Sequence, residues 1–151
     1  MTFVLSARSL RNLQGVRADL VEVVKRAIEI TEVDFVVTEG LRSIERQREL
    51  VAKGASQTMA SKHLTGQAVD LVAFLGNRVS WELALYDEIA DAMRTAAREQ
   101  NVGIRWGGAW NVSDIRRWAG LTMESAMTSY IDERRANGKR PFIDAPHFEL
   151  A

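Results

Sequence analysis

The first thirty residues carry apolar side chains at a spacing of three and four residues, which is typical of helices with one buried face. This pattern predicts one or two amphipathic helices from Leu10 to about Ile30, with an apolar stripe of Leu13, Val16, Leu20, Val23, Val24, Ala27 and Ile28. An apolar run then predicts a strand over residues 34–40, and the polar stretch between Ser43 and Gly54 predicts a helix. Arg42 is therefore expected at the corner between that strand and that helix.

The rest of the chain mixes strands and helices. Residues 68–74 predict a strand, and a long helix is expected from an N-cap at Ser80 to a stop at Gly103, with an apolar stripe of Leu83, Tyr86, Ile89, Ala90 and Met93. We expect a glycine-interrupted strand over 104–110, a helix over 122–138, and a turn with a terminal strand over 140–151. This order favours an α+β fold, with a small, mostly antiparallel sheet flanked by helices in one domain over residues 1–151.

Composition then excludes several classes of function. Lysine and arginine together number 20, as do aspartate and glutamate, so no overall field attracts nucleic acid or an anionic membrane. The chain has no cysteine, so any metal site must use nitrogen and oxygen donors. The first residues are too polar for a signal peptide or a membrane span, so we expect the protein to be made and folded in a cytoplasm.

The chain has two histidines, His63 and His147, and each lies near a carboxylate. Asp70 stands inside the apolar run 68–74, where a charged carboxylate is costly unless a cation or hydrogen-bond donors balance it. A turn at Gly66 would let His63 and Asp70 point at one spot. Two imidazoles and one carboxylate are a common ligand set for catalytic zinc, and they leave one position for a water molecule with a pKa near roughly 7.

The segment around His147 offers a general base for such a water molecule. Pro146 biases the residue before it toward an extended conformation, and period-two alternation then places His147 and Glu149 on one face of the terminal strand. Asp144 is the nearest candidate base, and Glu149 is the alternative. Simpler roles remain open: the histidines could be packed or surface residues, Asp70 could cap a turn or pair with an arginine, and Asp144 could be an ordinary turn residue.

The stretches "SKHLTGQAVD" and "DAPHFEL" together resemble the zinc peptidases that cut bacterial cell-wall peptides, the D-alanyl-D-alanine carboxypeptidase and L-alanyl-D-glutamate endopeptidase family. The resemblance implies that His63, Asp70 and His147 bind Zn²⁺ and that Asp144 is the general base. Many members carry glutamate at the position of Asp144, and the aspartate found here resembles the phage endolysin branch.

The resemblance extends from about Ser9 to the end and implies further site residues. "TEGLRSIERQREL" resembles the family's glycine-x-arginine element, so Arg42 is expected to hold a substrate carbonyl or carboxylate and to stabilise developing negative charge. The alternative is a surface ion pair with a glutamate such as Glu45. Gln47 is expected to face the site, or else to be a solvated helix residue.

Three more side chains are expected near the substrate. "RWGGAWN" is similar to the family's segment beside the cleft, so Trp106 and Trp110 would form a wall against the substrate, although a core position is the alternative for at least one of them. Ser61 would hydrogen-bond near the metal or cap a turn. Acids in the polar segment 111–140, namely Asp114, Glu124 and Asp132, could bind a second ion or form a solvated helix face.

The function that the resemblance implies is zinc-dependent hydrolysis of the L-Ala-D-Glu bond in the peptidoglycan stem peptide, as in an endolysin that lyses the bacterial wall. We expect a monomer without a separate wall-binding module, without nucleic-acid partners and without membrane insertion. It would be made in the host cytoplasm and would reach the periplasmic peptidoglycan after a holin opens the membrane. The alternatives are a D-alanyl-D-alanine carboxypeptidase and a non-catalytic, zinc-stabilised wall-binding module.

Overall fold

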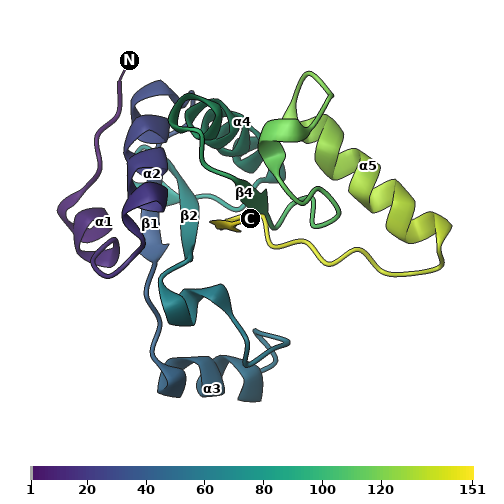
Figure 1. Cartoon of the computed structure of the whole chain (residues 1–151), viewed down its shortest axis with the longest axis horizontal. Helices are drawn as coiled ribbons and strands as arrows, with labels where there is room; N and C mark the ends of the chain where they lie inside the picture. Colours follow the sequence, from purple (N-terminus) through teal and green to yellow (C-terminus); the bar gives the residue numbers. More distant parts are fainter. Residues whose placement is uncertain (1) are drawn as a thin grey trace.

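The computed structural model describes residues 2–151 (Figure 1). Its strands form one antiparallel sheet in the order β1, β2, β5, β4, and a fifth strand, β3, pairs with β2 as a hairpin. The bounds of the strands are Phe35–Glu39 for β1, Ala68–Leu75 for β2, Arg78–Val79 for β3, Ile104–Trp106 for β4 and His147–Leu150 for β5. The predicted combination of helices with a small, mostly antiparallel sheet is confirmed.

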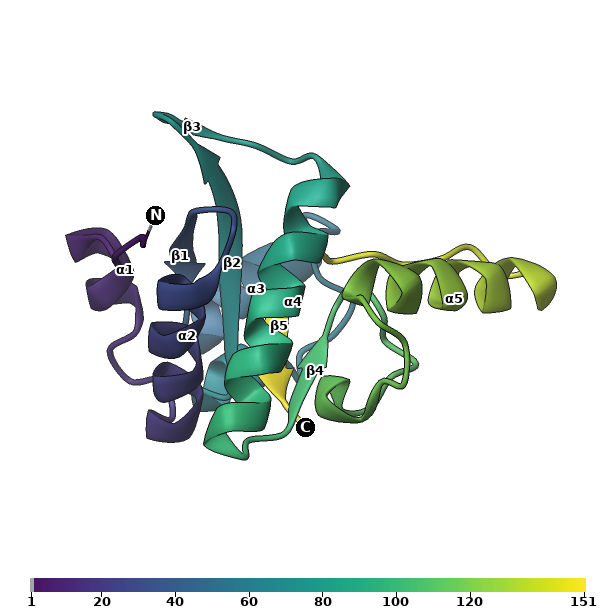
Figure 2. The same ribbon diagram turned by 90° about the horizontal axis from the view of Figure 1, so that it is seen from above.

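Two helices cover one face of this sheet. α2 (Ala18–Ile30) and α4 (Leu83–Gln100) lie side by side over the strands (Figure 2). Their apolar stripes meet the inward side chains of the strands in one core, which includes Leu20, Val24, Val37, Leu71, Ile89, Met93, Ile104 and Phe148. The helical periodicity therefore predicted the buried faces of α2 and α4 correctly, because an apolar stripe needs an apolar surface to pack against.

The remaining helices lie at the periphery. α1 (Ala7–Asn12) packs on β1, and a turn at Gly15, with φ of 83°, separates it from α2. α5 (Met123–Ala136) contacts α4 and extends away from the sheet (Figure 1). α3 (Ile44–Ala52) lies on the opposite side of the sheet from α2 and α4 (Figure 2). In residues 2–151, no helix combines the length and the apolar content that crossing a membrane requires.

Three predicted boundaries were wrong. α4 ends at Gln100, with its C-cap at Asn101 in the left-handed conformation, and not at Gly103. The N-cap of α4 is Glu82 and not Ser80, because the Ser80 N–H donates to the Ala73 carbonyl at 2.9 Å and so belongs to the β2–β3 hairpin. β4 ends at Trp106 and does not continue to residue 110, because Trp106 O accepts a turn hydrogen bond from Ala109 N at 3.2 Å. At Ser80 and at Trp106, backbone hydrogen bonds to neighbouring segments override the local sequence signal.

α4 also buries one acid. Asp87 is 8% exposed, and its Oδ1 has no hydrogen-bond partner within the part of the chain that the structure describes. Burial, followed by repulsion from Glu124, Asp91 and Glu88, raises the pKa of Asp87 to about 6. The charged form of this side chain is therefore a cost to the folded state at neutral pH.

We expect Asp87→Asn to stabilise the protein at pH 7, because an amide avoids this cost and can donate to the neighbouring acids. The folded-state pKa lies above the ordinary value of about 4, so the wild type loses stability as the pH rises from about 4 to about 6. Urea unfolding should give a gain of about 1–3 kcal/mol at pH 7 and a much smaller gain at about pH 4. Asp132→Asn, at an exposed position of α5, is the control, and an equal gain at both pH values would contradict the assignment.

Candidate metal centre and active-site cleft

The register of the sheet brings three polar residues into one row. Glu39 of β1 is paired with Asp70 of β2, and Asp70 is paired with His147 of β5. Because successive side chains on a strand alternate between faces, residues paired across antiparallel strands share a face. The row therefore lies across three strands at the end of the sheet near η1, the short 3-10 helix Lys62–Thr65.

η1 supplies the second imidazole. Ser61 caps it by accepting a hydrogen bond from His63 N at 3.2 Å, and Gly66 ends it with φ of 71°. The His63 ring is 2% exposed. Its Nδ1–H donates to Gly40 O at 2.8 Å, and its Nε2 faces Asp70 Oδ1 at 3.3 Å.

Whereas His63 faces the Asp70 carboxylate with Nε2, His147 faces it with Nδ1. Its Nδ1 lies 3.5 Å from Asp70 Oδ1, and its Nε2–H donates to Glu149 Oε1 at 2.8 Å. The two imidazole rings meet edge to face, with centroids 5.2 Å apart. Each ring is thus fixed by a hydrogen bond on its outer nitrogen, as is usual for histidines that bind metals.

The donor set fits a metal ion. The ligand atoms of His63, Asp70 and His147 all lie within 4.8 Å of one another, and within residues 2–151 they are the one such group of three. Atoms that bind zinc tetrahedrally at about 2.0–2.2 Å are about 3.3–3.5 Å apart, and both histidines approach Asp70 Oδ1 at such distances. Nitrogen and carboxylate oxygen donors suit zinc among the common divalent ions.

Without an ion, protons balance the Asp70 charge. Burial alone would raise the pKa of Asp70, but hydrogen bonds from His147 and His63 outweigh it and hold that pKa well below its usual range. Burial opposes protonation of His147, yet hydrogen bonds to Asp70 and Glu149 raise its pKa to about 9. A site that gathers protons in this way is one where a divalent cation can replace them.

Asp144 lies beside this cluster, at the start of a hydrogen-bonded turn over residues 144–147. His147 N donates to Asp144 O at 3.0 Å, Asp144 N donates to Gly107 O at 2.9 Å, and Trp106 Nε1 donates to Ala145 O at 2.7 Å. A Cβ on Gly107 would overlap Asp144 O, so only glycine permits this approach. Burial, and then repulsion from Asp70, raise the pKa of Asp144, which suits a general base.

Arg42 is held rigidly by a partner that the sequence did not identify. Its Nε and Nη2 donate to the two carboxylate oxygens of Glu39, each at 2.7 Å, and Nη2 lies 3.7 Å from Asp70 Oδ2. The alternative of a surface pair with Glu45 is wrong, because Arg42 is buried and Glu39 occupies its fork. The bidentate pair aims the guanidinium at the metal-ligand cluster.

Gln47 is the one residue of α3 that is fully buried. Its Oε1 accepts from Arg42 Nη1 at 2.7 Å, and its amide nitrogen donates to Ser56 Oγ at 2.9 Å and to Thr58 O. The alternative of a solvated helix residue is therefore wrong. Gln47 joins Arg42 to the loop that follows α3.

The two tryptophans have different positions. Trp106 is fully buried and holds the Asp144–His147 turn, so it cannot form the expected substrate wall. Trp110 lies on the cleft, with its ring centroid 5.3 Å from that of His147. Phe142, which lies outside every recognised motif, stacks on Trp110 at 6.3 Å and is 43% exposed.

These groups line one cleft of about 660 Å³, a volume in the range of small-ligand sites. Its lining includes Arg42, Ser61, His63, Asp70, Trp110, Phe142, Asp144 and His147. Most of the expected site residues are thus gathered in one place. The exceptions are Trp106 and Gln47, which are buried behind the lining of the cleft. The cleft combines a metal-ligand set, a carboxylate, a guanidinium and an aromatic surface, a combination that can support metal-assisted hydrolysis of an amide.

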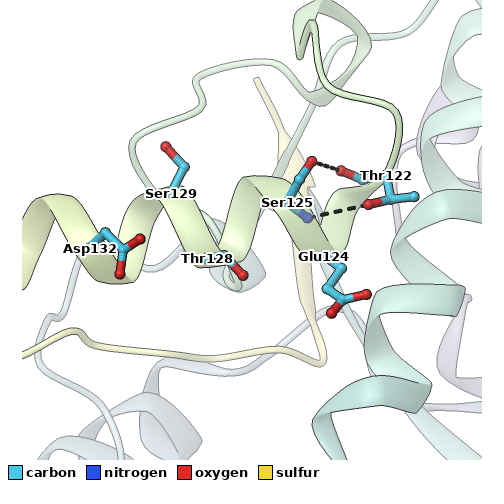
Figure 3. Close-up of a pocket in the computed structure, with 6 residues that line it drawn as sticks. All are labelled: Thr122, Glu124, Ser125, Thr128, Ser129 and Asp132. Carbon is cyan, nitrogen blue, oxygen red and sulfur yellow. Dashed lines mark hydrogen bonds between the residues drawn. The ribbon is translucent and has the colours of Figure 1, made fainter.

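The acids of segment 111–140 are not gathered. Asp114 is paired with Arg116 at 2.8 Å, while Glu124 and Asp132 lie at different turns of α5 among exposed hydroxyl groups (Figure 3). Figure 3 shows the two carboxylates separated along α5, with Thr128 between them. This surface is a solvated helix face.

Solved structures define the class of protein. The L-Ala D-Glu endopeptidase ChiX of Serratia marcescens is 42% identical with a TM-score of 0.72, and the match covers 99% of this chain and 90% of that one. The vancomycin-resistance D,D-dipeptidase VanXYg, in complex with a D-Ala-D-Ala phosphinate analogue, is 19% identical with a TM-score of 0.51, over 99% of this chain and 61% of that one, and it shares the fold. Fold and cleft together are those of a peptidase.

The particular family follows from the whole sequence. Residues 1–151 match the phage L-alanyl-D-glutamate peptidases, and the chain belongs to that family. The L-alanyl-D-glutamate peptidase of Escherichia phage T5 is 29% identical over 117 residues, which are 75% of this chain and 85% of the relative. The resemblance that the two histidine motifs indicated is confirmed.

Proposed function

We propose that this protein is a zinc-dependent endolysin that hydrolyses the L-Ala-D-Glu bond of the peptidoglycan stem peptide. The observation that carries the proposal is the convergence of His63, Asp70 and His147 beside Asp144 in one cleft. Membership of the phage L-alanyl-D-glutamate peptidase family supports the choice of bond. The 42% identity to the Serratia marcescens endopeptidase supports a Gram-negative wall as the substrate, while a Listeria phage peptidase is 32% identical over 114 residues.

His63, Asp70 and His147 would hold the zinc ion, which supplies a Lewis acid and lowers the pKa of water. Asp144 accepts the proton of the attacking water and passes it to the leaving amine nitrogen. The other three carboxylates of the cleft are engaged, because Asp70 is a proposed ligand, Glu39 is bound by Arg42, and Glu149 is held by His147 and Lys62. Burial, and then repulsion from Asp70, raise the pKa of Asp144, which favours uptake of that proton.

Arg42 binds the substrate carbonyl or a substrate carboxylate and stabilises the developing negative charge. Glu39 balances most of the arginine charge, so Arg42 acts through directed N–H groups rather than through a long-range field. Trp110 and Phe142 offer an apolar surface beside His147 for the rest of the stem peptide. Ser61 acts indirectly, by fixing the start of η1.

The biological setting is proposed from the family. A phage peptidase of this kind is made in the host cytoplasm as a monomer and reaches the periplasmic wall once the membrane is permeabilised, with a holin as the partner that opens it. A lysis assay on intact cells with and without membrane permeabilisation tests this setting, since lysis without permeabilisation would contradict it.

Digestion of purified Gram-negative peptidoglycan, with products identified by mass spectrometry, tests the activity. We expect stem peptides released from L-Ala, and no release after treatment with a chelator until zinc is restored. Free D-alanine would instead support a D-alanyl-D-alanine carboxypeptidase. An undigested wall with zinc bound to the protein would support a non-catalytic wall-binding module.

A further inference from the structure

The two histidines of the cluster are held by different kinds of acceptor. His63 donates from Nδ1 to a backbone carbonyl, that of Gly40, whereas His147 donates from Nε2 to the carboxylate of Glu149 at 2.8 Å. The two rings consequently face Asp70 with opposite nitrogens. A neutral imidazole has one N–H and one lone pair, so the acceptor of the N–H decides which nitrogen is free to bind a metal.

Glu149 is placed by the strand itself. It follows His147 by two residues on β5 and so shares its face, and it is buried. Its second oxygen, Oε2, lies 3.3 Å from Lys62 Nζ, and the same ammonium donates to Leu150 O. Lys62 precedes His63 in η1. Contacts therefore run from η1, through Lys62 and Glu149, to the ring of His147.

Both carboxylate oxygens of Glu149 are therefore occupied. Oε1 accepts from His147 on the side of the ring away from Asp70, and Oε2 faces Lys62. This arrangement excludes Glu149 as the alternative general base, because neither oxygen points toward the ligand nitrogens. A buried carboxylate between an imidazole N–H and an ammonium is instead suited to hold the imidazole still.

We propose that Glu149 is a positioning residue that fixes His147 with its proton on Nε2 and turns Nδ1 toward the metal, and that Lys62 fixes Glu149. This inference rests on the proposed zinc site and adds to it two residues that bind neither metal nor substrate. A carboxylate acceptor also makes the imidazole a stronger donor to the metal. His63, with a carbonyl acceptor, lacks this reinforcement, so the contribution of His147 is the one that Glu149 controls.

Zinc affinity and ring-nitrogen chemical shifts test this role without reference to activity. In the zinc-loaded wild type, long-range ¹H–¹⁵N spectra should show His147 with a protonated Nε2 and a metal-bound Nδ1. Glu149→Ala should weaken zinc binding by about 10–100-fold, measured by competition with a chromophoric chelator. Glu149→Gln should recover most of this loss, because the amide oxygen still accepts from Nε2–H, and Lys62→Met should cause a smaller loss than Glu149→Ala.

Glu22→Ala, at an exposed position of α2, is the matched control and should bind zinc as the wild type does. A His147 ring bound through Nε2 in the wild type would overturn the inference whether or not the alanine variant folds. Wild-type affinity in a folded Glu149→Ala would also overturn it while leaving the zinc site intact. A wild type that binds no zinc would overturn the proposed function, so the two failures are distinguishable.

Discussion

Replacing Asp144 with asparagine is expected to lower the rate of peptidoglycan hydrolysis by about 10²–10⁴-fold while leaving zinc bound. Asparagine keeps the size of the side chain and the turn that Gly107 and Trp106 hold, but it cannot accept a proton from water. Release of stem peptides measures the rate, and metal analysis measures zinc. A lower rate of hydrolysis with unchanged zinc content is the result expected for a general base.

Asp132→Asn is the matched control, because it makes the same change on the exposed surface of α5. It should lyse the wall at the wild-type rate. Wild-type lysis by the Asp144 variant would remove this residue from the chemistry. If the wild type also released no stem peptides, the non-catalytic alternative would be favoured.

Replacing Asp70 with alanine is expected to abolish stoichiometric zinc binding and, with it, all hydrolysis. Asp70 faces both imidazoles, so its loss removes one of the three donors and leaves only the two histidines. A loss of affinity of at least about 100-fold is expected in a chelator competition. Full zinc content in the Asp70→Ala protein would show that the metal lies elsewhere.

Asp70→Ala should also change how the protein responds to pH. The pKa of His147 is raised above its usual value through Asp70 and Glu149, so the wild type without metal gains stability from protonated His147 below about pH 6.5 and loses it as the pH rises toward 9. The variant should lose part of that gain. Unfolding in urea at several pH values, in the presence of a chelator, gives this comparison.

The candidate ligands could be predicted because strand alternation and a turn glycine are local signals. "HLTGQAVD" fixes a short helix, a turn and a strand within eight residues, and period-two alternation places His147 and Glu149 on one face. The register between the strands could not be predicted from the sequence. The pairs Glu39 with Asp70 and Asp70 with His147 join distant segments, so the Glu39 partner of Arg42 was missed.

The tryptophans show a second limit of sequence patterns. Trp106 and Trp110 flank the same two glycines, and which of them is buried depends on where β4 ends. Gly107 pairs with the Asp144–His147 turn, which buries Trp106 under that turn and leaves Trp110 on the cleft. Phe142 carries no motif at all, and only its stacking on Trp110 brings it to the site.

The row of paired residues across β1, β2 and β5 has a kinetic consequence. Helices form from local contacts within microseconds, whereas strands that are distant in the chain must first close long loops. Here the pairing of β2 with β5 is the same event that brings His147 to Asp70. During refolding, helical circular dichroism should therefore return before peptidase activity, which requires the pairing of β2 with β5.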